Sequence, residues 1–150
     1  DDMQDGNVTR PEDITEKAKE VSKRYPNKRI IVHYMQPHEP YIGENYYAPK
    51  SDLVDLYDEG KSWNEIRKYY EANLDRVLDS VKDLIDDIEG KIVISADHGE
   101  LLGEYGMHTH PHSIYVPELI EVPWLEIEKG ERREIKSESK QQETLEEIDF

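Results

Sequence analysis

The longest periodic segment of the chain is an amphipathic helix that is flanked on both sides by a run of β-branched residues. The helix is predicted from Ser62 to Ile88, where apolar residues recur every three or four positions and charged residues occupy the opposite face. Ser62 and Glu65 form a capping box at its start. The flanking runs predict buried strands at 29–36 and 91–96. A strand, a covering helix and a second strand make a unit that normally joins parallel strands.

Further elements are predicted before and after this unit. Pro11 begins a helix that Pro26 ends, because proline is tolerated in the first turn of a helix but not in its interior. Short helices are predicted at 51–59 and 100–104, and a third strand is predicted at 122–127. The fold class that follows is α/β, with a parallel sheet in an α/β/α sandwich.

The chain divides into one domain portion with a polar segment at each end. Residues 1–10 are predicted to be a flexible lead-in, residues 11–128 an α/β domain portion, and residues 129–150 a charged tail that is disordered or weakly helical. A chain of 150 residues can bury one substantial core but not two. Its first residue is not methionine, which suggests a fragment, a processed product or a trimmed chain.

Composition argues against several classes of partner. The net charge is −16, from 35 acidic and 19 basic residues, and such a surface repels phosphate backbones and anionic lipid. We therefore expect no nucleic-acid or membrane binding. The chain has no cysteine, so thiolate metal sites, disulfides and a cysteine nucleophile are excluded for it. It contains no signal peptide and no apolar run near the roughly 20 residues of a membrane span, so we expect a soluble protein of unknown compartment.

Residues with metal-binding chemistry follow the predicted strand at 91–96. Asp97 and His98 lie where that strand leaves the sheet, the edge at which open α/β sheets bind ligands. A carboxylate and an imidazole are two ligands for a divalent cation, and Gly99 permits the turn that lets both point the same way. The alternative is a simple Asx turn beside a packed histidine. Glu100 either accepts a ring N–H from a ligating histidine or caps a helix start.

More histidines follow the other predicted strand and the metal-binding pair. His38 lies between Pro37 and Pro40, which are expected to hold an extended, rigid loop. Three histidines alternate further along and would share one face of an extended segment: His108, His110 and His112. This alternation is typical either of a ligand array or of a solvated loop.

Two segments together resemble the sulfatase branch of the alkaline phosphatase superfamily. The first is residues 33–41, HYMQPHEPY, in which a strand runs into Pro-His-x-Pro-Tyr. The second begins with SADHGE at 95–100 and continues with Leu-Gly-Glu at 102–104, then His110, then Val-Pro at 122–123. The order of the motifs, their spacing and the long helix between them are similar to those of the family.

The resemblance implies an alkaline-phosphatase-like fold and a role for four residues. Asp97 and His98 would be ligands of a divalent metal ion, which could be Mn²⁺, Zn²⁺, Ca²⁺ or Mg²⁺. His38 and His110 would be the catalytic residues that contact the sulfate or phosphate group of an ester substrate.

The resemblance covers residues 29–127 and corresponds to the carboxyl-terminal part of such an enzyme. The family's amino-terminal half carries another acidic metal motif and the nucleophile, and neither is recognisable here: Asp1-Asp2 follows no strand, and Thr9 and Ser51 lack the nucleophile's context. We therefore expect the metal-binding part of a sulfatase-like hydrolase, inactive alone, whose partner is the absent amino-terminal segment of its parent chain. The alternatives are a non-catalytic metal- or anion-binding remnant of the fold, and a metal-sensing or storage patch without ester chemistry.

Overall fold

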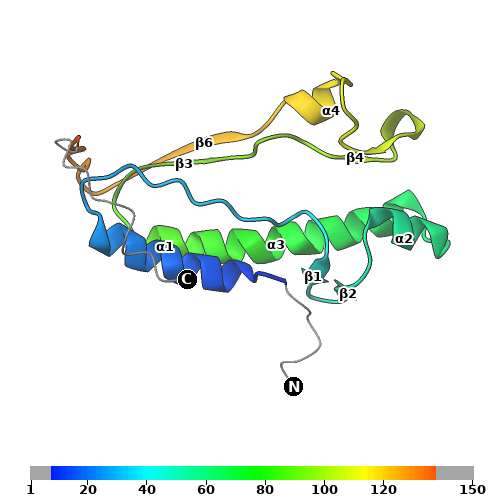
Figure 1. The fold of residues 1–150 in the computed structure, drawn as a ribbon, viewed down its shortest axis with the longest axis horizontal. Helices are drawn as coiled ribbons and strands as arrows, with labels where there is room; N and C mark the ends of the chain where they lie inside the picture. Colours follow the sequence, from blue (N-terminus) through cyan, green and yellow to red (C-terminus); the bar gives the residue numbers. More distant parts are fainter. Residues whose placement is uncertain (1–7, 138–150) are drawn as a thin grey trace, which may run out of the picture.

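The computed structural model describes residues 8–137, which form helices and short strands (Figure 1). The helices are α1 (Pro11–Arg24), α2 (Leu53–Asp58), α3 (Trp63–Asp87) and α4 (Pro117–Ile120), with a 3-10 turn η1 (Glu104–Gly106). The strands are β1 (Tyr41–Gly43), β2 (Tyr46–Ala48), β3 (Gly90–Ser95), β4 (Leu101–Leu102), β5 (His108–Thr109) and β6 (Trp124–Lys129). The mixed α/β class is confirmed. The predicted lead-in at 1–10 and tail at 129–150 lie partly outside the described residues.

Helices α1 and α3 lie side by side and run in the same direction (Figure 1). The Thr15 hydroxyl of α1 donates to the Ser80 carbonyl of α3 at 3.0 Å, and both residues are buried. One turn further along both helices, Lys19 Nζ lies 2.8 Å from Asp83 Oδ2. α1 begins at Pro11, as predicted, because the missing N–H of proline is not needed in the first turn.

A capping box begins both α2 and α3. The Ser62 N–H donates to Glu65 Oε2 at 2.9 Å, which confirms the predicted start of α3. The cap of α2 is Asp52, whose Oδ1 accepts a hydrogen bond from the Asp55 N–H at 2.8 Å, so the helix starts after the position we predicted. Asp55, at the third helical position, accepts a hydrogen bond from the Asp52 N–H at 3.2 Å, and this position of a capping box is usually occupied by glutamate or glutamine.

The described strands pair in three separate antiparallel ladders. β3 pairs with β6 from Gly90↔Lys129 to Ser95↔Trp124, β1 pairs with β2, and β4 pairs with β5. The strands predicted at 91–96 and 122–127 therefore exist, although the second begins only after Pro123. No parallel pair occurs among residues 8–137, so the parallel sandwich and its covering layers stay a prediction.

Residues 29–36 form no strand in the structure, so that prediction is wrong. A strand needs a neighbour that accepts and donates its backbone hydrogen bonds, and within 8–137 this segment has none. It runs back along α1 instead, where Tyr34 Oη lies 2.8 Å from Thr15 Oγ1 and Gln36 Nε2 donates to the Thr9 carbonyl at 3.1 Å. Ile31, in its β-branched run, is 95% exposed. The segment therefore has the sequence of a buried strand without the cover that a buried strand needs.

A small core forms where the first half of α3 meets α2 and the short strands. Its five buried members come from four elements, β1, α2, α3 and β4: Tyr41, Leu53, Leu56, Ile66 and Leu102. The helix predicted at 100–104 is absent, because the Gly103 backbone has a φ of 104°, which an α-helix cannot contain. A Cβ at Gly103 would lie 2.5 Å from the Trp63 ring, so the close approach also needs glycine.

None of the helices in the described part of the chain has both the length and the apolar character that crossing a bilayer requires. α3 has 25 residues, but charged side chains run along one of its faces.

Candidate metal and anion site

The four residues predicted to form the site lie together in the structure. The His98 and His110 ring centroids are 4.4 Å apart, and those of His38 and His110 are 6.2 Å apart. Asp97 Oδ2 lies 3.9 Å from His98 Nε2. Three segments that are distant in the sequence therefore bring one carboxylate and three imidazoles to one place.

The end of β3 positions Asp97 and His98. The Ser95 hydroxyl donates to the Pro123 carbonyl at 2.8 Å, which ties the end of β3 to the residue before β6. His98 Nδ1 lies 2.8 Å from the Gly99 carbonyl oxygen. When Nδ1 carries the proton it donates to this oxygen, and the lone pair of Nε2 is then free on the side that faces Asp97. A neutral histidine with one nitrogen engaged and the other free is the form that binds metals.

The Asp97 carboxyl is ionised and accessible at neutral pH. Burial raises the pKa of this carboxyl, but the backbone N–H groups of Asp97 and His98 and the nearby charge of His98 together lower it below its usual value. The His98 N–H donates to Asp97 Oδ1 at 3.1 Å, and the Asp97 side chain is 68% exposed. This contact reaches the next residue and not the one two positions on, so it is not the Asx turn of the alternative, and it leaves Oδ2 available to a cation.

Gly99 is required for close packing rather than for a turn. The φ of Gly99 lies outside the left-handed region, so the backbone here does not need the conformational freedom for a turn that the sequence suggested. The Gly99 N–H donates to the Leu119 carbonyl at 2.9 Å, and a Cβ on Gly99 would lie 1.9 Å from the Glu118 carbonyl oxygen. The backbone of α4 therefore presses directly on the loop that carries Asp97 and His98.

Gly99→Ala is expected to lower the free energy of unfolding by about 1–3 kcal/mol, because the methyl group forces α4 away from the loop. Urea unfolding followed by circular dichroism measures this change. Gly60→Ala is the comparison, since a Cβ at Gly60 meets nothing within 4 Å and only its φ of +90° is unfavourable. A Gly99→Ala variant as stable as the unsubstituted chain would contradict the packing role.

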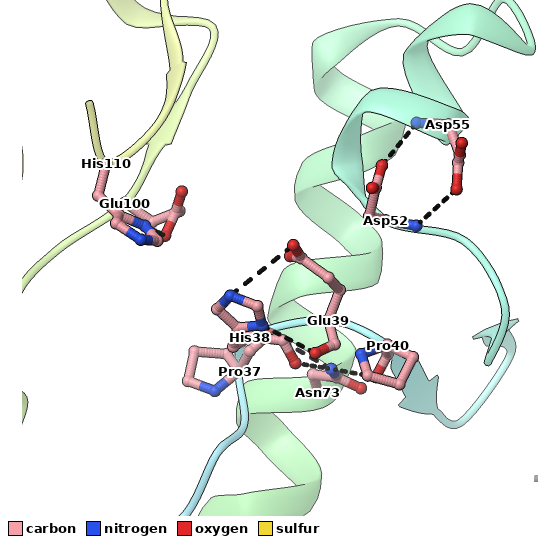
Figure 2. Close-up of polar contacts among 9 residues, drawn as sticks. All are labelled: Pro37, His38, Glu39, Pro40, Asp52, Asp55, Asn73, Glu100 and His110. Atoms are coloured by element: carbon pink, nitrogen blue, oxygen red, sulfur yellow. Dashed lines mark hydrogen bonds and ion pairs between the residues drawn. The ribbon is translucent and has the colours of Figure 1, made fainter. Parts of the chain in front are cut away.

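A buried asparagine of α3 holds the His38 loop (Figure 2). Asn73 Nδ2 donates to the carbonyls of Pro37, His38 and Pro40 at 3.3, 3.1 and 3.2 Å, and Asn73 Oδ1 accepts from the Ile42 N–H at 2.7 Å. The loop is thus a turn wrapped around one amide, not the extended loop that we expected. The Asn73 side chain has 0% exposure. Sequence reasoning placed Asn73 in the apolar stripe of the helix and missed this function, although a polar residue in such a stripe is itself a signal.

His38 also contacts the glutamate that follows it (Figure 2). His38 Nδ1 lies 2.8 Å from the Glu39 carbonyl oxygen, and His38 Nε2 lies 3.7 Å from Glu39 Oε1. One face of the ring therefore has an acidic neighbour, while its other neighbour across the site is His110.

Glu100 belongs to the site, and it neither caps a helix nor lies apart. His110 Nδ1 lies 3.0 Å from Glu100 Oε2 (Figure 2). One ligand atom from each of His98, Glu100 and His110 lies within 4.8 Å of the other two. These residues therefore fit a bound divalent cation without a large rearrangement.

The other two alternating histidines do not join this cluster. His108 stacks on the Trp63 ring, with centroids 5.8 Å apart. Thr109 has a φ of 63°, which breaks the extended backbone between His108 and His110. The expected common face for the alternating histidines is therefore wrong, and the described groups able to hold a metal include neither His108 nor His112.

An open groove of 890 Å³ lies elsewhere, along the β1–β2 hairpin and α3. It contains none of the four predicted site residues, and no titratable group within it is paired with an imidazole. We therefore place the candidate site at the histidines.

Comparison with known proteins agrees with the motifs. A family model described as Sulfatase matches residues 2–150. The low-salt glycan biosynthesis sulfotransferase Agl7 of Haloferax volcanii is 35% identical over 113 residues, which are 67% of this chain and 26% of the relative. The chain thus spans about a quarter of the length of that relative. No solved structure matches it significantly. Since the family model covers nearly all of the sequence, the chain belongs to the sulfatase family.

Proposed function

We propose that the chain is the metal- and anion-binding part of a sulfatase-like enzyme that acts on sulfate or phosphate esters. The sulfatase family generally uses a divalent metal ion and acts on sulfate esters. The observation that supports the proposal most strongly is the convergence of Asp97, His98, His38 and His110 from distant segments.

Asp97 and His98 would hold the metal ion. Their Oδ2 and Nε2 atoms are 3.9 Å apart, somewhat more than the roughly 3.0–3.4 Å between neighbouring ligands that each lie about 2.1 Å from one ion, so a small side-chain rotation would complete the pair. The exposed, ionised carboxylate favours Mn²⁺, Mg²⁺ or Ca²⁺. When bound, the ion would polarise a non-bridging oxygen of the ester and lower the pKa of the nucleophile.

His38 and His110 would donate hydrogen bonds to the oxygens of the sulfate or phosphate group. Negative charge builds on these oxygens during transfer, so fixed N–H donors lower the barrier. Asn73 would act as a positioning residue, because it binds the carbonyls on both sides of His38. This arrangement binds and orients the group that is transferred, whereas the nucleophile would come from elsewhere.

The nucleophile would belong to the amino-terminal segment of a longer parent chain. Two facts support this: the chain spans 26% of its relative, and several large apolar side chains are exposed. They include Ile31 at 95%, Met35 at 58% and Trp124 at 68%. Covering side chains as exposed as these with another segment would remove apolar area from water, which is favourable.

The chain alone is expected to show no Mn²⁺-dependent hydrolysis of p-nitrophenyl sulfate or p-nitrophenyl phosphate, because it supplies no recognised nucleophile. Release of p-nitrophenol measures this, and reactions without protein are the control. Metal-dependent turnover that disappears in His38→Ala would contradict the proposal that the nucleophile lies outside the chain.

Binding of inorganic sulfate tests the anion site independently of turnover. His38→Ala or His110→Ala should weaken sulfate binding to the Mn²⁺-loaded chain by about tenfold, since each removes a hydrogen bond to a charged group. Calorimetry measures the affinity, and His112→Ala is the matched control. Equal affinities in all variants would remove the anion role and leave a metal-binding remnant of the fold.

A second candidate is transfer of the sulfuryl group to a sugar hydroxyl. Its support is the name of the Haloferax volcanii relative, a sulfotransferase of glycan biosynthesis. The same metal and histidine contacts would serve both reactions, and only the acceptor differs, a hydroxyl in place of water. Binding of a monosaccharide to the Mn²⁺- and sulfate-loaded chain, detected by saturation-transfer NMR, would favour transfer over hydrolysis.

A further inference from the structure

Glu100 and His110 make a contact that the proposed function does not use. Glu100 Oε2 lies 3.0 Å from His110 Nδ1, and the Glu100 side chain is only 13% exposed. The His98 and His110 side chains beside it are each 43% exposed. The carboxylate therefore lies at the base of the cluster, and the two imidazoles open it to solvent.

The three groups are arranged as ligands of one ion. A ligand atom of each lies within 4.8 Å of the other two, and the two imidazole rings have centroids 4.4 Å apart. Two ligand atoms that each lie about 2.0–2.1 Å from a tetrahedral ion are less than 4.8 Å apart, so small side-chain rotations would bring the three ligand atoms onto one ion. The backbone supports the geometry, because His98 Nδ1 contacts the Gly99 carbonyl and fixes the ring.

The cluster has two nitrogen ligands and one oxygen ligand, and so a larger share of nitrogen than the Asp97-His98 pair. Two imidazoles and one carboxylate suit Zn²⁺, Ni²⁺ or Cu²⁺, whereas sites rich in oxygen ligands suit Mn²⁺, Mg²⁺ and Ca²⁺. A fourth, open position remains for water, as in sites where three protein groups hold Zn²⁺.

We infer that His98, Glu100 and His110 form a second binding mode, for a transition-metal ion such as Zn²⁺, in which Glu100 and His110 are ligands. Asp97 is not required for this mode. His98 is common to both modes, so the two ions exclude each other. Bound Zn²⁺ would then prevent His98 from binding a metal ion together with Asp97, and would prevent His110 from contacting the anion. This regulatory consequence rests on the proposed function, whereas the Zn²⁺ site itself does not.

Calorimetric titration of the chain with Zn²⁺ tests the ligand set. Glu100→Gln and His110→Ala should each weaken Zn²⁺ binding by more than about 100-fold, beyond the roughly 10–100-fold that the loss of an outer-shell partner costs. His112→Ala should change it by less than about twofold. Asp97→Asn removes a charge 3.9 Å from His98 Nε2 but no ligand of this mode, so it should weaken Zn²⁺ binding by less than about tenfold. The absorption spectrum of the Co²⁺-loaded chain should show a tetrahedral site that Glu100→Gln abolishes, and circular dichroism confirms that each variant is folded.

Two results would overturn the inference: unchanged Zn²⁺ affinity in Glu100→Gln, or loss of Zn²⁺ binding in Asp97→Asn. The parallel Mn²⁺ titration separates this inference from the proposed function. Glu100→Gln should keep Mn²⁺ binding while it loses Zn²⁺. If Zn²⁺ binds as expected and Mn²⁺ binding does not depend on Asp97, the Zn²⁺ site is supported and the proposed metal pair is not.

Discussion

Asn73→Leu is expected to lower the free energy of unfolding by roughly 3–5 kcal/mol, the largest stability effect of any substitution considered for this chain. The substitution removes four hydrogen bonds at a residue with 0% exposure. It leaves the Ile42 N–H without its acceptor, and the carbonyls of the His38 loop without their donor. Urea unfolding followed by circular dichroism measures the change.

Two further variants make the Asn73 result interpretable. Asn73→Asp keeps the acceptor for the Ile42 N–H but loses the three donated hydrogen bonds, so it should also be destabilising. It replaces Asn73→Leu in the measurement if that variant does not fold. Tyr41→Phe is the control: Tyr41 is buried, and its hydroxyl has no hydrogen-bond partner among residues 8–137. Its removal should leave stability unchanged or raise it by about 1 kcal/mol. A cost below about 1 kcal/mol for Asn73→Leu would contradict the role of Asn73.

Asp97→Ala is expected to weaken Mn²⁺ binding by at least about 100-fold, because the exposed carboxylate is the only charged ligand in the Asp97-His98 pair. His98→Ala should have a comparable effect, since it removes the other ligand. Calorimetric titration of each variant measures the affinity.

A control for net charge is needed, because the chain carries −16 and each acidic residue attracts cations nonspecifically. Glu16→Ala removes the same charge from an exposed position of α1, in a groove that holds none of the site residues, and should change Mn²⁺ affinity by less than about twofold. Equal losses in Asp97→Ala and Glu16→Ala would reduce the metal site to a general effect of the acidic surface.

The two long helices, α1 and α3, could be predicted from sequence because their signals are local. Pro11 and the Ser62–Glu65 capping box act within one turn, and both mark the true helix starts. The strand at 29–36 could not be judged in this way, because a strand exists only with a neighbour that the local sequence does not specify. The antiparallel pairing of β3 with β6 was missed for the same reason.

The site was only partly predictable, for a similar physical reason. Asp97, His98, His38 and His110 were found from motifs, and the structure places them together. The function of Asn73 depends on carbonyls more than thirty residues away in the sequence, so the local pattern shows only a polar residue in an apolar stripe and not its partners. Glu100 was predicted either to accept a ring N–H from a histidine or to cap a helix start, and the sequence alone could not choose because His110 approaches Glu100 only in the folded chain.

A crystal structure of the chain grown with Mn²⁺ and sulfate would test the central claim most directly. We predict Mn²⁺ at about 2.0–2.6 Å from a carboxylate oxygen of Asp97 and from His98 Nε2, located by its anomalous scattering. Sulfate should lie beside it, within hydrogen-bond distance of His38 and His110. An ion that contacts neither Asp97 nor His98, or a sulfate bound only on another face, would contradict the account.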